Sequence, residues 1–175
     1  MVEMAHDTLA PASFSLPRLL AERLTDEHLP FIRRMDQDPR LAATLGGVRT
    51  EAETRDYLAR NLAHWAEHGF GIWILREPGT GTLMGRAGLR QVEVEGATEV
   101  EIAYALCPEF WGRGLATDVA RACVTIGREW LGTPSLVGLV LPGNIASQRV
   151  LRKAALIRER ELLYRGLRHL LYRTD

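Results

Sequence analysis

The spacing of apolar residues along the chain predicts a mixture of helices and strands. Helix signals occur from Thr25 onward and over residues 50–69, 114–131 and 147–154. Alternating or short apolar runs, which are typical of strands, occupy residues 18–24, 71–76, 83–94, 99–106, 136–141, 159–164 and 167–173. Because some strands follow one another directly while helices separate others, we expect the α+β (mixed α/β) class, with six to seven strands and about four helices.

The second helix has clear start and stop signals. The hydroxyl of Thr50 can cap the first turn, and Glu53 three residues later completes a capping box. Gly69 is expected to end the helix, because glycine readily takes the left-handed conformation found at helix ends. The apolar residues expected in the core, here and elsewhere in the chain, include Leu58, Leu62, Trp65, Trp73 and Trp130.

The composition is that of an ordinary globular chain. It has 175 residues, of which 46% are hydrophobic and 25% are charged. A chain of this length needs only one core, so we expect a single domain over 1–175, with 1–14 as a loose N-terminal segment. Lys and Arg number 22, as do Asp and Glu. The formal net charge of zero gives no whole-chain attraction to nucleic acid or anionic membranes, so neither partner is expected.

Neither the first residues nor the cysteines indicate export. Residues 1–14 lack the basic start and apolar run of a signal peptide, and no apolar run reaches the length of a membrane helix. Cys107 and Cys123 have no disulfide or metal spacing, so a reduced, cytoplasmic setting is expected. Cys107 could be a nucleophile, but a lone cysteine in an apolar stretch is more often a small buried hydrophobe.

A strand, a tight loop and a helix follow one another over residues 99–122. The loop contains Gly112 and Gly114, and an amphipathic helix starts directly after it. Glycines let backbone N–H groups approach a ligand closely, and a helix N-terminus favours negative charge. The loop therefore predicts an anion cradle suited to a pyrophosphate, although helix starts also use glycine for steric reasons alone. It matches neither GxxxxGK[ST] nor GxGxxG, because Thr117 replaces the third glycine of the latter.

The loop sequence PEFWGRGLAT, residues 108–117, resembles the acyl-coenzyme A loop of the GCN5-related N-acetyltransferases (GNAT), and most of all the branch of the ribosomal-protein alanine N-acetyltransferases. The similarity extends in family order through ERLT, GFGIWIL, EIAYAL and PGNIASQRVLRKAAL, and so over nearly the whole chain. It implies a mostly antiparallel, twisted sheet that is splayed between its fourth and fifth strands. It also implies acetyl-coenzyme A (acetyl-CoA) as acyl donor, and no metal.

The resemblance assigns cofactor contacts to particular positions. The amides of residues 112–117 would hold the pyrophosphate, and pantetheine would bond the backbone near Ala105 and Leu106. Asn144 would contact the pantetheine arm or a water, and Trp111 would cover the cofactor or anchor the loop. The cofactor-binding candidates are Ala105, Leu106, Trp111, Gly112, Arg113, Gly114, Leu115, Ala116, Thr117, Asn144 and Ser147.

Two residues are expected to be catalytic. Glu101 matches an acidic family position that relays a proton through water, so it is the candidate base for the amine, with Glu99 as its substitute. Alternatively, one or both glutamates are solvated strand residues that pair with arginines. Ser147 would protonate the leaving thiolate. Tyr104 and Tyr164 are further candidate acids, although tyrosines in strands more often serve packing.

The sequence departs from the family pattern at two positions. Ala155 stands where the family usually has a glycine in left-handed conformation, so we expect the helix before it to end differently and the wall near the acyl group to be reshaped. Ala103, at a position where glycine is frequent, could narrow the gap beside its strand. The basic side chains of Arg149, Arg152 and Lys153 could reach the cofactor phosphates or lie on a solvated helix face.

The sequence HWAEH, residues 64–68, matches HxxEH, the zinc signature of inverted metalloproteases. His64 and His68 would lie on one helix face. The motif falls in the last helical turn, however, where the helix dipole favours histidine, and no later glutamate-bearing helix of the expected kind follows. A structural role is therefore the preferred interpretation, and no metal is expected.

These observations predict an enzyme that transfers an acetyl group from acetyl-CoA directly to a primary amine in a ternary complex. The acceptor is a protein N-terminus or a small-molecule amine, and the family places its recognition in the early helices and the final hairpin. The alternative is a non-catalytic acyl-CoA-binding sensor with the same fold. Because many relatives are dimers, a homodimer is also expected.

Overall fold

A computed structural model describes residues 9–175, which form one eight-stranded sheet and five α-helices. The strands are β1 Ser13–Leu16, β2 Leu19–Arg23, β3 Ile72–Arg76, β4 Leu83–Val94, β5 Ala97–Leu106, β6 Val137–Val140, β7 Leu156–Tyr164 and β8 Leu167–Thr174. The helices are α1 Leu29–Gln37, α2 Pro39–Leu45, α3 Glu51–His68, α4 Leu115–Glu129 and α5 Ile145–Lys153. The α+β class is confirmed, with β1 as the strand and α2 as the helix that the sequence analysis did not predict.

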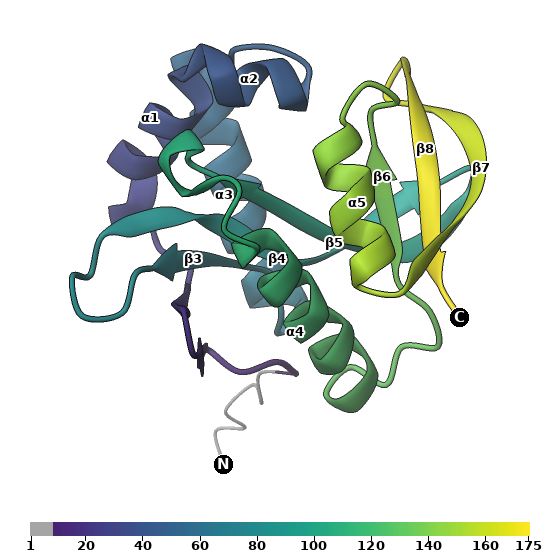
Figure 1. The fold of residues 1–175 in the computed structure, drawn as a ribbon, viewed down its shortest axis with the longest axis horizontal. Helices are drawn as coiled ribbons and strands as arrows, with labels where there is room; N and C mark the ends of the chain where they lie inside the picture. The colour runs from purple at the N-terminus through teal and green to yellow at the C-terminus, as the bar shows by residue number, and fades with distance from the viewer. Residues whose placement is uncertain (1–8) are drawn as a thin grey trace, which may run out of the picture.

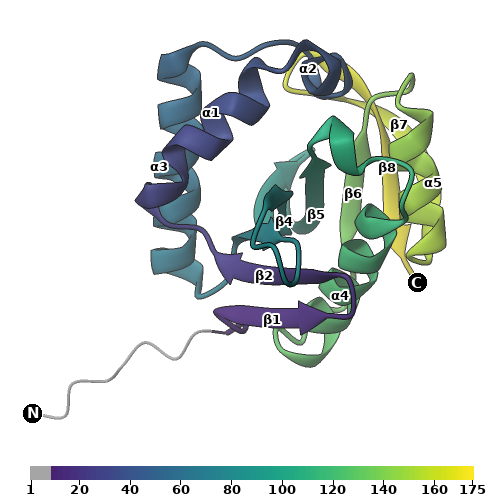
Figure 2. The ribbon, with the colours of Figure 1, turned by 60° about the vertical axis from the view of Figure 1, so that its left-hand side comes forward.

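The sheet has the order β1-β2-β3-β4-β5-β6-β8-β7 and is antiparallel except between β5 and β6. Those two strands run parallel and pair at a single position, Glu101 with Val137. Beyond Glu101, residues 102–106 of β5 continue without a partner on β6. The fourth and fifth predicted strands, residues 99–106 and 136–141, correspond to β5 and β6, so the expected splay is present. Figure 2 shows these two strands side by side.

Helices cover the two faces of the sheet differently. Side chains of α1 and α3, together with Ile72 and Ile74, form one buried cluster that also contains Ala105. Side chains of α4 pack on the opposite face against Ile102 and Leu106. Figure 1 shows α1, α2 and α3 together on the left and α5 beside β6 and β8 on the right. Alternate residues of β5 therefore face two different layers of helices.

Local capping signals explain most helix boundaries. The capping box of Thr50 and Glu53 is present, and Gly69 ends α3 with a left-handed φ of 72°. The unpredicted helix α2 begins at Asp38, whose side chain accepts a hydrogen bond from the Arg40 amide. Pro39 takes the first helical position, where its missing N–H costs nothing.

Two expectations about the ends of elements are wrong. Trp130 is 55% exposed instead of buried, since it is the C-cap residue at the very end of α4. Residues 13 and 14, expected to be loose, belong to β1, and Phe14 packs edge-on against the buried Trp73 at 5.2 Å. The remainder of the expected loose segment lies partly outside the described residues, which begin at 9.

The departure at Ala155 does not change how α5 ends. Ala155 itself adopts the left-handed conformation, with a φ of 67°, directly after the helix end at Lys153 and Ala154. Its amide donates to the Arg152 carbonyl, as a helix terminus requires. The expectation of a different end is therefore wrong, and the chain retains the geometry at a conformational cost of about 1–2 kcal/mol.

Within residues 9–175 the structure contains no helix that is both long and apolar enough to cross a membrane.

Candidate active site

The loop before α4 has the backbone geometry of an anion cradle. Gly112 and Gly114 both have positive φ, 76° and 77°, and Gly114 is the N-cap residue of α4. A Cβ at Gly112 would meet no atom within 4 Å, so this side of the loop is open. Leu115 and Thr117 in the first helical turn are buried, and at a helix start their backbone amides have no intrahelical acceptor.

Arg18 holds this loop from the turn between β1 and β2, a contact that sequence reasoning missed. Its guanidinium bonds Asp118 in the first turn of α4 through Nε at 3.1 Å and Nη2 at 2.6 Å, and it also donates to the Arg113 carbonyl. Asp118 would otherwise place a negative charge at the helix N-terminus. The ion pair neutralises that charge where an anion would bind. The separation of 100 residues left no sequence signal for the pair.

Trp111 anchors the loop to the sheet. Its indole Nε1–H donates to the Leu106 carbonyl at 2.8 Å, and the ring remains 44% exposed. Of the two expected roles for Trp111, the geometry supports anchoring. Arg113 folds back over the loop, donating to the Glu109 carbonyl and lying over the Phe110 ring.

Tyr104 and Ser147 meet on the face of β5 that packs against α4 and α5. The Tyr104 hydroxyl lies 2.8 Å from Ser147 Oγ and donates to the Ser147 carbonyl at 3.0 Å. Burial raises the pKa of the Tyr104 phenol well above its usual range, so the phenol is protonated at neutral pH. Asn144 caps α5 by accepting from the Ser147 amide at 3.1 Å, which fixes Ser147 at the helix start.

Glu101 is buried at the position where β5 leaves β6, and it is ion-paired. Its Oε2 accepts from Arg90 Nε at 2.8 Å, and the side chain is 6% exposed. Its Oε1 makes no hydrogen bond within residues 9–175. Glu99 is bound by Arg173 at 2.8 Å. Both glutamates pair with arginines, as the alternative interpretation expects, but Glu101 is buried and not solvated, and it is the one of the two that lies beside the splay.

The remaining tyrosine candidate lies elsewhere. Tyr164 packs against a small apolar cluster that contains Val92 and Val137, and its ring meets the edge of His169 at 5.5 Å. It makes no contact with Ser147. The packing role of Tyr164 is therefore the one that the geometry supports.

The three basic side chains of α5 do not form a cluster around the loop. Arg152 donates to the Tyr172 hydroxyl at 3.2 Å, and Arg149 and Lys153 are exposed. A solvated face is the arrangement found in the structure.

Neither cysteine has the environment of a reactive thiol. Burial raises the pKa of the half-buried Cys107, and Glu109 raises it further. Full burial raises the pKa of Cys123 to about 12. Because the thiolate is the reactive form, a nucleophilic role is not supported for either residue.

The HxxEH segment is structural. His64 Nδ1 lies 2.8 Å from the Phe70 carbonyl, and His64 Nε2 accepts from the Gln91 amide at 2.9 Å. Both ring nitrogens are thus engaged with the backbone, and burial lowers the pKa of His64. No set of three metal-ligating side chains comes together among the residues that the structure describes.

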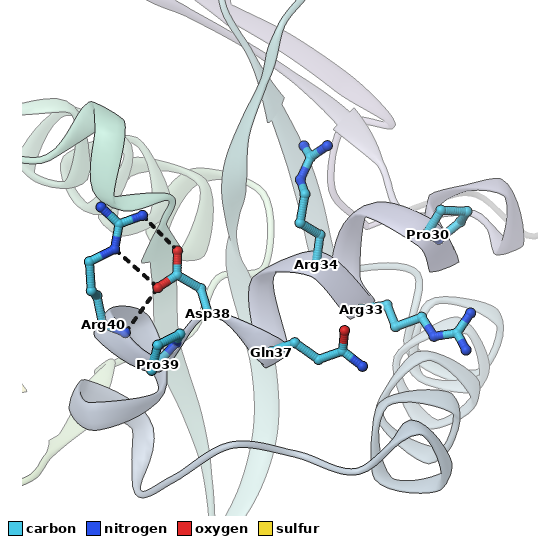
Figure 3. A pocket seen from close by; sticks show the side chains of 7 residues that line it. All are labelled: Pro30, Arg33, Arg34, Gln37, Asp38, Pro39 and Arg40. Atoms are coloured by element: carbon cyan, nitrogen blue, oxygen red, sulfur yellow. Dashed lines mark hydrogen bonds and ion pairs between the residues drawn. The ribbon is translucent and has the colours of Figure 1, made fainter.

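Of two surface hollows, the larger lies away from the candidate site and the smaller reaches its glycine loop. The larger, about 480 Å³, is an open depression on α1 and the start of α2, where Arg40 binds Asp38 (Figure 3). It includes neither Ser147 nor the α4 loop. The smaller, about 300 Å³, is lined by Arg18, Arg113 and their neighbours at the loop. We therefore locate the candidate site by its backbone geometry and side-chain contacts.

Comparisons with known proteins agree with this geometry. An Acetyltransferase (GNAT) domain matches residues 18–156. The uncharacterized protein YkkB of Bacillus subtilis (strain 168) is 31% identical over 116 residues, which are 66% of this chain and 67% of YkkB. The acetyltransferase from Agrobacterium tumefaciens str. C58 has a TM-score of 0.83 at 24% identity over 95% of each chain. The ribosomal L7/L12 alpha-N-protein acetyltransferase RimL, solved in complex with coenzyme A, has a TM-score of 0.74 at 18% identity over 94% of this chain and 96% of RimL. The chain therefore belongs to the GNAT acetyltransferase domain family, which confirms the family, the fold and the enzyme class expected from its sequence.

Proposed function

We propose that this protein is an N-acetyltransferase that moves an acetyl group from acetyl-CoA directly to a primary amine in a ternary complex. The observation that carries the proposal is the open glycine loop at the N-terminus of α4, next to the divergence of β5 from β6. A helix N-terminus binds phosphates, and the divergence exposes strand backbone to which a pantetheine arm can bond. RimL, a relative by fold, is solved with coenzyme A.

The amides of residues 112–117 hold the pyrophosphate in this account, and Ala105 and Leu106 receive pantetheine. The Leu106 carbonyl already accepts from Trp111, so a pantetheine amide uses its second lone pair. Asn144 keeps Ser147 at the start of α5, facing Tyr104 across the site.

Proton transfer requires one donor and one acceptor. The Ser147 hydroxyl can give its proton to the leaving thiolate while the Tyr104 phenol, 2.8 Å away, turns its own proton from the Ser147 carbonyl to Ser147 Oγ. On the opposite face of β5, Glu101 keeps Oε1 available while Arg90 fixes Oε2. Glu101 then takes the proton of the amine through a water. No covalent enzyme intermediate is needed, which agrees with two cysteines held as thiols.

The test is turnover with a panel of amines: amino acids, polyamines, aminoglycosides and peptides with free N-termini. Release of free coenzyme A and the mass of the acetylated amine are measured together. We expect at least one amine to accelerate release, and Glu101→Gln to lower kcat with little change in acetyl-CoA affinity. Binding of acetyl-CoA without acceleration by any amine would identify the protein as a sensor instead.

The setting of the reaction follows from the same chemistry. Free thiols at Cys107 and Cys123 fit a reducing compartment, so we propose that the protein acts in the cytoplasm. We also propose a homodimer, which light scattering of the purified protein tests.

A further inference from the structure

A buried charged cluster lies between α1, α3 and β4, on the face of the sheet opposite Tyr104. Asp36, which is 3% exposed, accepts from Arg86 Nη2 at 2.9 Å and from Arg49 Nη1 at 3.3 Å. It also accepts from Thr54 Oγ1 at 2.8 Å. One carboxylate thus serves two guanidinium groups.

Both guanidinium groups also lie on one aromatic ring. The Cζ atoms of Arg86 and Arg49 are 4.4 Å and 4.7 Å from the centre of the Tyr57 ring. The ring shields them from water and leaves their charges close together. Burial lowers the pKa of Arg49, and repulsion by Arg86 lowers it further. With one carboxylate facing two guanidinium groups, the cluster carries an excess of positive charge.

The cluster also lacks a hydrogen-bond acceptor. Arg86 is 4% exposed, yet its Nη1 has no partner within residues 9–175, the one buried side-chain nitrogen or oxygen there in this condition. An unpaired buried donor is costly, and a buried guanidinium costs more than a neutral group. One missing acceptor and one missing negative charge are both supplied by a single carboxylate.

The position of the cluster relates it to the acceptor. Arg86 pairs in register with Ala105, and Arg90 pairs with Glu101 four residues further along the same face, about 13 Å away at the usual rise of a strand. Between them lie Gly88 and Ala103, which present almost no side chain. Both ion pairs lie on the side of the sheet covered by α1 and α3, and the backbone of Gly71 and Ile72 lies close against Gly88 between them.

We propose that Arg49 and Arg86 bind a carboxylate of the acceptor, so that the acceptor is a small amine carrying a carboxylate, such as an amino acid. This inference rests on the proposed function. The Arg49 side chain is 32% exposed and is the part of the cluster that an incoming ligand meets first. A guanidinium binds a carboxylate through two parallel hydrogen bonds, and Arg86 Nη1 supplies a further donor. Polyamines and aminoglycosides would bring positive charge to a site that already has too much.

The first test compares amino acids with their carboxamides, which differ only in the negative charge. The amide has the less basic amine and hence more free amine at neutral pH, so intrinsic reactivity favours the amide. We expect the acids to have a kcat/KM about tenfold higher or more, as a charged hydrogen-bonded pair predicts. Equal or better use of the amides would overturn the inference.

The second test assigns the preference to Arg49. We expect Arg49→Gln to reduce the acid-to-amide ratio toward one while acetyl-CoA affinity is unchanged, and Arg49→Lys to restore part of it. Arg55→Gln, an exposed arginine that pairs with Glu51 on α3, is the matched control and keeps the ratio. A ratio that survives Arg49→Gln, in protein whose thermal melt shows it folded, would contradict the assignment.

A binding measurement separates this inference from the proposed function. Amino acids and their amides are titrated calorimetrically into wild-type protein and Arg49→Gln, each saturated with coenzyme A, where no turnover occurs. Binding of the acids that the substitution weakens about tenfold supports the subsite even if no acetylation is found. Equal affinities for amino acids and their amides would overturn the carboxylate subsite even if another amine is acetylated.

Discussion

The Tyr104 hydroxyl lies 2.8 Å from Ser147 Oγ, joining β5, where it diverges from β6, to the first turn of α5. The same hydroxyl donates to the Ser147 carbonyl at 3.0 Å. Burial raises the pKa of the Tyr104 phenol, so the phenol keeps its proton at neutral pH and can hold the Ser147 hydroxyl in place as the donor to a neighbouring thiolate. Tyr104 and Ser147 thus act as a unit in the proposed transfer.

Removal of the phenol hydroxyl should slow the chemical step. We expect Tyr104→Phe and Ser147→Ala each to lower kcat by roughly tenfold or more, with the acetyl-CoA dissociation constant little changed. The double variant should be no slower than the slower single variant, because the two groups form one proton path. Steady-state kinetics check this, and fully additive losses would show that the residues act separately.

The contact of Arg18 with Asp118 should affect cofactor affinity alone. Arg18→Ala leaves the Asp118 carboxylate unneutralised at the start of α4, so we expect acetyl-CoA binding to weaken by roughly three- to tenfold, with kcat at saturation unchanged. Adding Asp118→Asn should restore the affinity. Arg128→Ala, at the other end of the same helix, is the control. Calorimetry checks the series, and equal affinity in wild-type protein and Arg18→Ala would refute the role.

Replacing the left-handed Ala155 by glycine should stabilise the folded protein. Ala155→Gly removes a conformational cost of the folded chain that exceeds the entropy glycine adds to the unfolded chain, so the free energy of unfolding should rise by about 0.5–1 kcal/mol. Ala59→Gly, exposed in the middle of α3, should instead lower it by about 1 kcal/mol. Chemical denaturation measures both variants. Destabilisation by Ala155→Gly would show that residue 155 does not adopt the left-handed conformation.

His64 should make stability depend on pH. Burial lowers its pKa in the folded state below the usual 6.5, so the unfolded chain binds the proton more readily. The contribution of neutral His64 to stability is therefore complete above about pH 6.5, and it is lost as the pH falls toward the folded-state pKa. His64→Gln should flatten the decline between pH 7 and 5, whereas His169→Gln should not. Thermal melts across this range check it, and parallel curves for wild-type protein and His64→Gln would contradict it.

Signals confined to a few neighbouring residues predicted local structure well. Thr50 and Glu53 form the capping box, Gly69 ends α3, and Gly112 and Gly114 take the positive φ that the loop required. Each of these depends on backbone sterics or on hydrogen bonds within one turn. The resemblance supplied what such signals lack, namely the mostly antiparallel sheet and the splay between β5 and β6.

Contacts between distant segments could not be predicted. Arg18 with Asp118, and Arg86 with Asp36, join residues 100 and 50 positions apart, and nothing in the local pattern pairs them. One signal was nevertheless present. Arg86 and Arg90 stand four residues apart in β4 with only Ala, Gly and Leu between them, so the two-residue period of a strand puts both charges on one face. Buried charges need partners, which marks this face as polar.

The most direct test of the central claim is a calorimetric titration of the protein with acetyl-CoA, repeated with dephospho-coenzyme A and with the variant Gly112→Ala. A Cβ at this positive-φ position strains the loop and obstructs the open side of the cradle. We predict that the wild-type protein binds acetyl-CoA with a micromolar dissociation constant and that Gly112→Ala weakens this affinity by about tenfold or more. Absence of binding to the wild-type protein would mean that the loop only starts a helix, and the proposed acetyl transfer would be wrong.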